Sequence, residues 1–96
     1  MSYYISLMNL TQQGIENLKE IPERVENFRQ LCNSKGVKIH GHYITFGQHD
    51  VVFILEAPDD TTMMATLMSV ESKGNLRTTT LKAFTYEDAK NVIDNL

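Results

Sequence analysis

Three histidines and one aspartate near the middle of the sequence could together bind a metal ion. His40 and His42 are two residues apart, and His49 directly precedes Asp50. On a strand, side chains two residues apart share a face, and imidazoles with a carboxylate can bind zinc, copper or iron. The spacing matches no metal-binding motif. The alternative is that the histidines are polar side chains at a subunit face or in solvent.

Asp50 has three candidate roles, one of which involves Arg77. A buried aspartate can act as a general base, whereas an aspartate in a hairpin turn usually accepts hydrogen bonds from backbone N–H groups. Asp50 could also pair with Arg77 across a sheet, or Arg77 could hold a small carboxylate ligand. Tyr43 could present its hydroxyl to a cavity between sheet and helix, or be a core tyrosine. The candidate ligand-binding residues are therefore Tyr43, His49, Asp50 and Arg77.

The familiar sequence motifs of catalysis are absent. There is no glycine-rich phosphate loop, CxxC pair, GxSxG or HExxH. The enzyme classes that these motifs identify are therefore disfavoured, and no cofactor is expected. Cys32 is the one cysteine. On the apolar face of a helix it is expected to be a buried, inert side chain. A single cysteine forms no internal disulfide, which fits a reducing compartment.

Length and charge restrict the classes of protein to consider. The 96 residues predict one domain over residues 1–96. The formal net charge is −3 and the basic residues are scattered, which argues against nucleic-acid binding. No apolar run approaches the roughly 20 residues of a membrane span, and no secretory signal pattern is visible. The expected location is the cytoplasm.

The elements that position these residues alternate between strands and helices. Residues 2–10 and 51–55 are apolar on both alternating sets, which is typical of strands covered on both faces. Between them, Pro22 divides a helical pattern into a short first helix and a main helix that ends at Lys35-Gly36. A strand over 37–46 and a turn at 47–49 then lead into the strand that contains 51–55.

The second half of the chain repeats this plan. Asp59 or Asp60 should cap a helix whose apolar side carries Met63, Met64, Leu67, Met68 and Val70, and which Lys73-Gly74 ends. The methionines could be core or the lining of a soft pocket. A threonine-rich strand is predicted over 75–84. Thr85 should cap a last helix whose buried edge is formed by Ala89, Val92, Ile93 and Leu96.

Together the elements predict an α+β domain with a four-stranded antiparallel sheet. The order strand, helix, strand, strand, helix, strand, helix is the ferredoxin-like arrangement, and right-handed crossovers place its first and third strands at the centre. Helices can cover only one face of this sheet. Because the other face also carries apolar residues, we expect a homodimer or higher homo-oligomer whose sheets pack face to face, a dimeric α/β barrel.

Short fragments along nearly the whole chain are similar to one protein family. They are Tyr4-Ile5-Ser6-Leu7, Thr11 with Gly14-Ile15, Pro22 with Arg24, Gly41-x-Tyr43-x-Thr45-x-Gly47-x-x-Asp50, Glu56-Ala57-Pro58-Asp59-Asp60 and Gly74-Asn75-x-Arg77-Thr78-x-Thr80-Leu81-x-Ala83-Phe84. In this order the chain resembles the GYD-domain family, named for a Gly-Tyr-Asp motif. The resemblance implies a dimeric α+β barrel of ferredoxin-like halves and no established reaction. His49 replaces the motif's tyrosine, although an imidazole could still donate a hydrogen bond.

Three functions are consistent with the sequence. The leading hypothesis is a small homo-oligomeric binding or structural protein with a modest apolar cavity that takes a small molecule. The second is a cofactor-free monooxygenase or isomerase acting on a small aromatic or carboxylic compound, in which Tyr43, Asp50, Arg77 and a histidine meet in one pocket. The third is metal binding through His40, His42 and His49.

Overall fold

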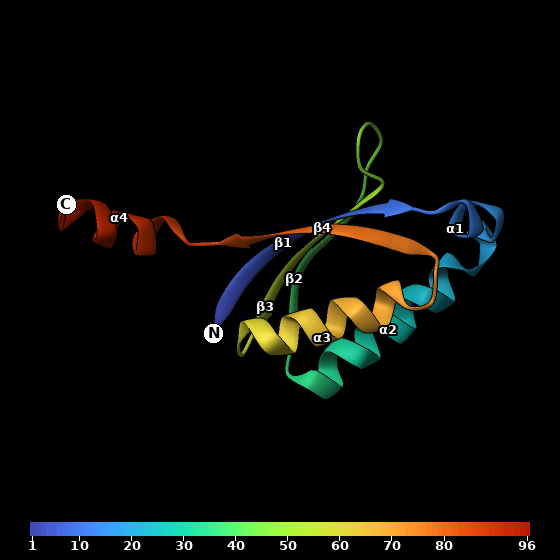
Figure 1. Cartoon of the computed structure of the whole chain (residues 1–96), viewed down its shortest axis with the longest axis horizontal. Helices are drawn as coiled ribbons and strands as arrows, with labels where there is room; N and C mark the ends of the chain where they lie inside the picture. Colours follow the sequence, from blue (N-terminus) through green and yellow to red (C-terminus); the bar gives the residue numbers. More distant parts are fainter.

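The computed structural model describes all 96 residues and has the predicted order of elements (Figure 1). The order confirms the ferredoxin-like α+β class. None of the helices combines the length and the apolar character that a membrane crossing requires. The elements are β1 (Ser2–Leu10), α1 (Gln12–Glu16), a short 3₁₀-helix (Leu18–Glu20), α2 (Ile21–Lys35), β2 (Lys38–Ile44), β3 (Val51–Ala57), α3 (Asp60–Glu71), β4 (Leu76–Ala83) and α4 (Tyr86–Asp94).

The four strands form one antiparallel sheet in the order β2-β3-β1-β4. The two strands that the sequence predicted to be central, β1 and β3, are therefore the inner pair. Their register aligns Ser6 with Phe53 and Met8 with Val51. The prediction that residues 51–55 lie in the interior of the sheet is confirmed.

Local signals in the sequence explain where the helices begin and end. The Thr11 side chain accepts a hydrogen bond from the N–H of Gly14, and Asp59 accepts one from Thr62. Pro22 lies in the first turn of α2, where its missing N–H costs nothing. Gly36 follows α2 with φ of 73°, a left-handed conformation that glycine adopts without strain. The predicted division of the first helical segment at Pro22 is confirmed.

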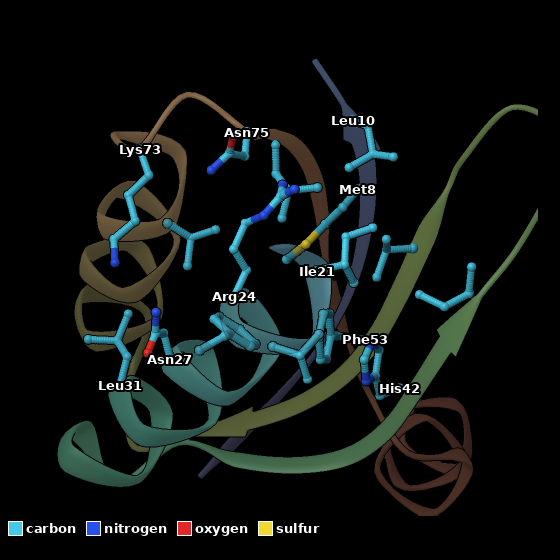
Figure 2. A pocket seen from close by; sticks show the side chains of 16 residues that line it. Met8, Leu10, Ile21, Arg24, Asn27, Leu31, His42, Phe53, Lys73 and Asn75 are labelled. Atoms are coloured by element: carbon cyan, nitrogen blue, oxygen red, sulfur yellow. The ribbon is translucent and has the colours of Figure 1, made fainter. Parts of the chain in front are cut away.

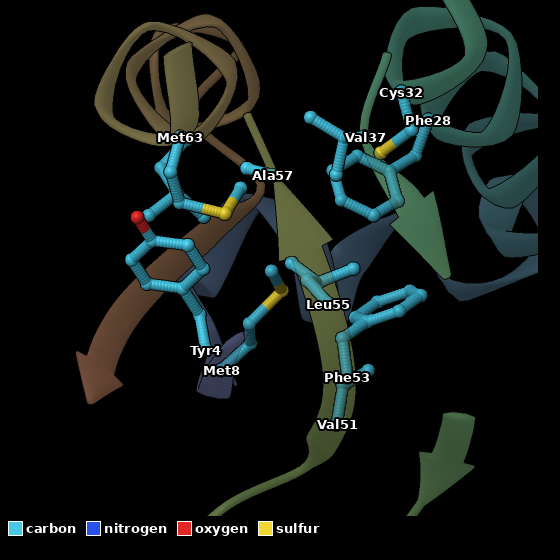
Figure 3. Close-up of a cluster of buried hydrophobic side chains, with 11 residues drawn as sticks. Tyr4, Met8, Phe28, Cys32, Val37, Val51, Phe53, Leu55, Ala57 and Met63 are labelled. Atoms are coloured by element: carbon cyan, nitrogen blue, oxygen red, sulfur yellow. The ribbon is translucent and has the colours of Figure 1, made fainter. Parts of the chain in front are cut away.

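Helices α2 and α3 lie on the same side of the sheet, and the core fills the space between (Figure 1). Alternate residues of β1 and β3 point toward these helices and are buried, as Figure 3 shows. The completely buried side chain of Leu55 is at the centre of this layer. Cys32 is buried in it as a free thiol, as predicted. The core side chains are Tyr4, Met8, Phe28, Cys32, Val37, Val51, Phe53, Leu55, Ala57, Met63 and Leu67.

A β-bulge in β2 corrects one prediction. The pairing with β3 shifts between Ile39 and Gly41, so the strict alternation of side chains is interrupted there. As a result His40 lies on the face opposite the helices, where it bonds Glu56, and His42 lies on the helix side, stacked on Phe53. The expectation that His40 and His42 share a face is wrong.

Two apolar helix faces predicted to be buried are largely open in the single chain. In α3, Met63 and Leu67 are buried, but Met64 and Met68 are exposed. The last helix, α4, projects away from the sheet at the end of β4 (Figure 1), and its Val92 and Ile93 side chains are 65% and 60% exposed. The predicted buried edge of α4 is therefore wrong for the chain by itself.

Candidate functional site

The face of the sheet that no helix covers is the first candidate site, called the open face below. Its side chains alternate with those of the core, and its centre is apolar across all four strands. Tyr43 is 58% exposed and Leu81 is 49% exposed on the two edge strands. The apolar residues of the open face are Ile5, Leu7, Tyr43, Val52, Ile54 and Leu81.

Polar groups border this apolar centre at both ends. At one end the His40 imidazole lies 2.8 Å from the Glu56 carboxylate, and Tyr3 packs near the same imidazole. At the other end Asn9 faces Arg77 across β1 and β4. An apolar centre with a polar rim is the usual anatomy of a protein–protein interface.

Two of the predicted ligand-binding residues, His49 and Arg77, lie at the Asn9 end of the open face. His49 Nδ1 is 2.8 Å from Asn9 Oδ1, and Arg77 is the β4 residue paired with Asn9. Arg77 forms no ion pair within the chain, so the alternative of an Asp50–Arg77 charge pair is wrong. The amide of Asn9 also donates to the backbone carbonyl of Gln48 at 2.7 Å, which ties the β2–β3 loop to β1.

Asp50 and Tyr43, the other two predicted ligand-binding residues, lie in different parts of the structure. The Asp50 carboxylate accepts a hydrogen bond from the backbone N–H of Leu10. This is a structural role like the one predicted, but with β1 rather than the hairpin turn as donor. Tyr43 lies on β2, separated from Arg77 on β4 by three strand spacings, roughly 14 Å. The structure does not gather Tyr43, Asp50, Arg77 and a histidine in one pocket, as the enzyme hypothesis requires.

The three histidines do not form the metal site considered from the sequence. They lie on the open face, on the helix side and at the β2–β3 loop, respectively. No group of three or more His, Cys, Asp or Glu side chains in the chain is arranged to hold a metal ion.

The second candidate site is a small cavity between α2 and the helix side of the sheet (Figure 2). Its volume is about 100 Å³ and most of its lining is hydrophobic. Of the candidate ligand-binding and metal-binding residues, His42 alone lines it. The lining residues are Met8, Leu10, Ile21, Arg24, Val25, Asn27, Phe28, Leu31, His42, Ile44, Val51, Phe53, Val70, Lys73, Asn75 and Leu76.

Two nitrogen atoms of this lining are buried without a hydrogen-bond partner. They are Nε of Arg24 and Nε2 of His42. The other end of the Arg24 guanidinium is occupied, because Nη2 donates to the carbonyls of Asn17 and Gly14. Burial, reinforced by the positive charge of Arg29, lowers the pKa of His42, so its ring is neutral at pH 7 and presents one donor and one acceptor nitrogen.

The polar side chains along a groove between α3 and β4 are paired with one another. The Tyr4 hydroxyl donates to Asp60, which also pairs with Lys82 at 3.1 Å. Burial and the Asp60 carboxylate raise the pKa of Tyr4 to about 12. Next to them, the hydroxyls of Ser6, Thr78 and Thr80 bond one another. Because these polar groups are paired within the chain, the groove has fewer free hydrogen-bonding groups for a ligand than the cavity has.

Arg24 is the cavity residue whose role was not predicted from the sequence. A signal for it does exist, because Arg24 follows Ile21 by three residues and precedes Phe28 by four. That spacing puts a charged residue within the apolar stripe of α2. A charge at such a position is either a snorkelling side chain or a group that serves a site.

The comparisons with known proteins identify the family. The family model described as GYD domain matches residues 4–93. The chain belongs to the GYD-domain family. A GYD relative from Thermus thermophilus, named "Glutamine synthetase and cystathionine beta-lyase binding protein", is 34% identical over 89 residues. The match covers 92% of this chain and 94% of the relative.

Solved structures with the same fold include regulators from M. tuberculosis. The feast or famine regulatory protein, in complex with L-methionine, matches with a TM-score of 0.66 and 12% identity, and the leucine response regulatory protein with 0.65 and 12%. Both matches cover 88% of this chain, which spans about half (51%) of each regulator. A protein from Thermus thermophilus matches with a TM-score of 0.62 and 18% identity, over 88% of this chain and 95% of its own. At these identities the likeness shows the fold alone.

The chain departs from the GYD pattern at His49. His49 occupies the position of the motif's tyrosine, and its ring bonds Asn9 Oδ1. An amide oxygen only accepts, so the imidazole is the donor. The expectation that His49 could supply a hydrogen bond in place of the phenol is consistent with this geometry.

Proposed function

We propose that this GYD-domain protein is a homodimeric binding protein: two copies pack through their open faces, and the dimer binds partner enzymes. The open face carries the proposal. Its apolar side chains extend without a break from Tyr43 on one edge strand to Leu81 on the other. Contiguous apolar surfaces of this kind on soluble proteins are typically interaction sites.

Two features of the open face favour a second copy as its occupant. A sheet face can pack on an identical face around a two-fold axis, because such an interface is self-complementary. Small chains also bury a modest share of their surface when folded alone, and here only 14 of 96 residues are buried. Pairing of the sheets would give Ile5 and Ile54 the cover that the helices give Leu55.

The proposed partners come from the relative. Its printed name states that it binds glutamine synthetase and cystathionine β-lyase, and the 34% identity extends over 92% of this chain. We propose the same class of partner here, enzymes that act on amino acids. We also propose a cytoplasmic location, because Cys32 is a free thiol and free thiols persist in reducing compartments.

Sedimentation velocity at micromolar concentration tests the dimer. The wild-type chain should sediment as a dimer, and Ile54→Glu, which places a charge in the centre of the open face, should sediment as a folded monomer. Gln30→Glu adds the same charge to the exposed side of α2 and is the matched control, which should remain dimeric. A monomeric wild-type chain, or an Ile54→Glu variant that stays dimeric, would contradict the proposal.

Binding to immobilised glutamine synthetase and cystathionine β-lyase of the same species tests the partner. Retention of the wild-type chain on either enzyme, but not on an unrelated protein of similar charge, is the expected result. Absence of retention on both enzymes would rule out the proposed partners. It would not affect the proposed dimer, which the sedimentation experiment tests separately.

A further inference from the structure

The last helix, α4, has an apolar edge that its own chain leaves exposed. The helix projects beyond the sheet where β4 ends (Figure 1). Val92, Ile93 and Leu96 lie within one turn of each other along one side of it, and all three side chains are exposed. Helices with an apolar side usually bury it against another element, so the cover for α4 has to come from outside the chain.

The dimer proposed above limits where α4 can lie, and the inference drawn below rests on that proposal. Two copies stacked through their open faces are related by a two-fold axis between the sheets, and stacked sheets commonly keep their strands nearly aligned. If the axis runs across the strands, each end of one sheet lies over the opposite end of the other. If it runs along the strands, equivalent ends lie together.

The register of β1 and β4 identifies the two ends of the sheet. Ala83, the last residue of β4, pairs with Tyr3 near the start of β1, whereas Arg77 pairs with Asn9 near its end. The helix α4 therefore leaves the sheet at the end opposite Arg77. With the axis across the strands, the two β4 strands lie over each other in opposite directions, and α4 of each copy reaches the Arg77 end of the other.

Unpaired charges of opposite sign meet in this arrangement. Asp94 already has an ion-pair partner within α4, which leaves Glu87 and Asp88 as acidic residues of α4 without one. Asp88 is four residues before Val92 and borders the apolar edge, whereas Glu87 lies on the far side of the helix. On the open face, Arg77 is exposed and has no ion pair within the chain.

An axis along the strands gives a poorer match of charges. It would bring α4 to the end of the second copy where β2 begins, beside Lys38 and His40. Both already face an acidic residue, because Glu56 is the register partner of Lys38 and lies 2.8 Å from His40. Arg77 would then remain without an acidic partner, so the charges favour the axis across the strands.

The Arg77 end of the sheet also offers apolar cover. The β2–β3 loop is at this end, because Val51, the first residue of β3, pairs with Met8 of β1. The loop extends from the sheet on the side away from α2 and α3 (Figure 1), which is the side of the second copy. Its Phe46 side chain is fully exposed and is available to an apolar partner.

We propose that α4 of each copy packs against the Arg77 end of the second copy, where Asp88 pairs with Arg77 and the apolar edge of α4 contacts the β2–β3 loop. The contact occurs twice in the dimer, because a two-fold interface is self-complementary. It gives the exposed edge of α4 and the unpaired guanidinium a partner at the same time, and it fixes the relative direction of the two sheets.

A spin label on α4 tests this placement. The label is attached to Glu87→Cys, outside the proposed contact, while Cys32 is buried. After mixing with isotope-labelled wild-type protein, the amide signals of Arg77 and Phe46 in the unlabelled-cysteine copy should broaden. The same label on Gln30→Cys, on the exposed side of α2, should leave them sharp. Broadening around Lys38 instead, or none in a sample that sedimentation shows to be dimeric, would overturn the placement of α4 alone; a monomeric wild-type chain would overturn the dimer as well.

Dimer dissociation constants test the Asp88–Arg77 pair. Asp88→Asn and Arg77→Gln should each weaken the dimer about threefold or more, as expected for an exposed ion pair formed twice. The double variant should be no weaker than either single variant, because both remove the same interaction. Glu87→Gln removes a charge from the same turn of α4 and should dissociate as the wild type does. Additive losses, or an Asp88→Asn dimer as tight as the wild type, would overturn the pair.

Discussion

The carboxylate of Asp50 accepts a hydrogen bond from the backbone N–H of Leu10 at 2.9 Å, and the Asp50 N–H donates to the carbonyl of Met8, also at 2.9 Å. Asp50 therefore joins the end of the β2–β3 loop to β1. This pairing accounts for an aspartate at this position without a catalytic role.

Asp50→Ala should lower the free energy of unfolding by about 1–3 kcal/mol, because the Leu10 N–H loses its acceptor. Asp50→Asn should cost less, since its amide oxygen still accepts. Urea denaturation of the three proteins measures the difference. Equal losses in both variants would show that the negative charge, rather than the hydrogen bond, is what matters.

The low pKa of His42 makes the stability dependent on pH. The unfolded chain protonates His42 near its ordinary pKa of about 6.5, whereas burial and Arg29 disfavour the charged ring in the folded state. Between these two pKa values the unfolded state binds more protons, so the free energy of unfolding falls as pH drops below about 6.5 and levels off below the folded pKa.

Urea unfolding of wild-type and His42→Phe protein between neutral and mildly acidic pH checks this prediction. The variant should lose part of the pH dependence, because its ring does not titrate. Identical pH profiles would mean that His42 has the same pKa in both states.

Leu55 and Ile54, neighbours in β3, should differ in whether the loss of stability on substitution depends on protein concentration. Leu55 is completely buried beneath the helices, and Leu55→Ala should cost about 2–5 kcal/mol at any concentration. Ile54 points to the open face, so the cost of Ile54→Ala should grow with concentration as the wild-type dimer gains stability by mass action. Denaturation over a hundredfold concentration range compares them. A constant cost for Ile54→Ala would count against the dimer.

Gly14 is at a close contact between α1 and the α3–β4 turn. A Cβ atom there would lie 2.2 Å from the carbonyl oxygen of Asn75, an overlap that requires the backbone to move. We expect Gly14→Ala to destabilise the fold by about 1–3 kcal/mol, despite the better helix propensity of alanine. Thermal denaturation measures this loss, with Gln12→Ala on the exposed side of α1 as control. A Gly14→Ala variant as stable as the wild type would show that the contact relaxes freely.

The elements of the fold could be predicted because each has a local signal. Pro22 divides the first helix, Asp59 caps α3, and the apolar run from Val51 identifies an inner strand. The bulge of β2 was not predicted, since one inserted residue leaves the composition of a strand unchanged. Gly41 was the available signal, because a glycine within a strand often marks a bulge.

The site could be predicted only in part, for a different reason. Hydrophobic patterns show that a face needs cover but not which chain supplies it. The amphipathic pattern of α4 therefore predicted a buried edge that the single chain leaves exposed. The cavity depends on Arg24 and His42, which come from distant segments and meet only through the packing of α2 on the sheet.

An isotope-filtered NOE experiment on a mixed sample of labelled and unlabelled protein shows directly whether two copies of the chain pack through their open faces. Each contact it detects joins two different copies of the chain. We expect intermolecular contacts among the methyl groups of the open face, which belong to Ile5, Val52, Ile54 and Leu81. Intermolecular contacts confined to α3 and α4, or none at concentrations well above micromolar, would show that the open face is not a dimer interface.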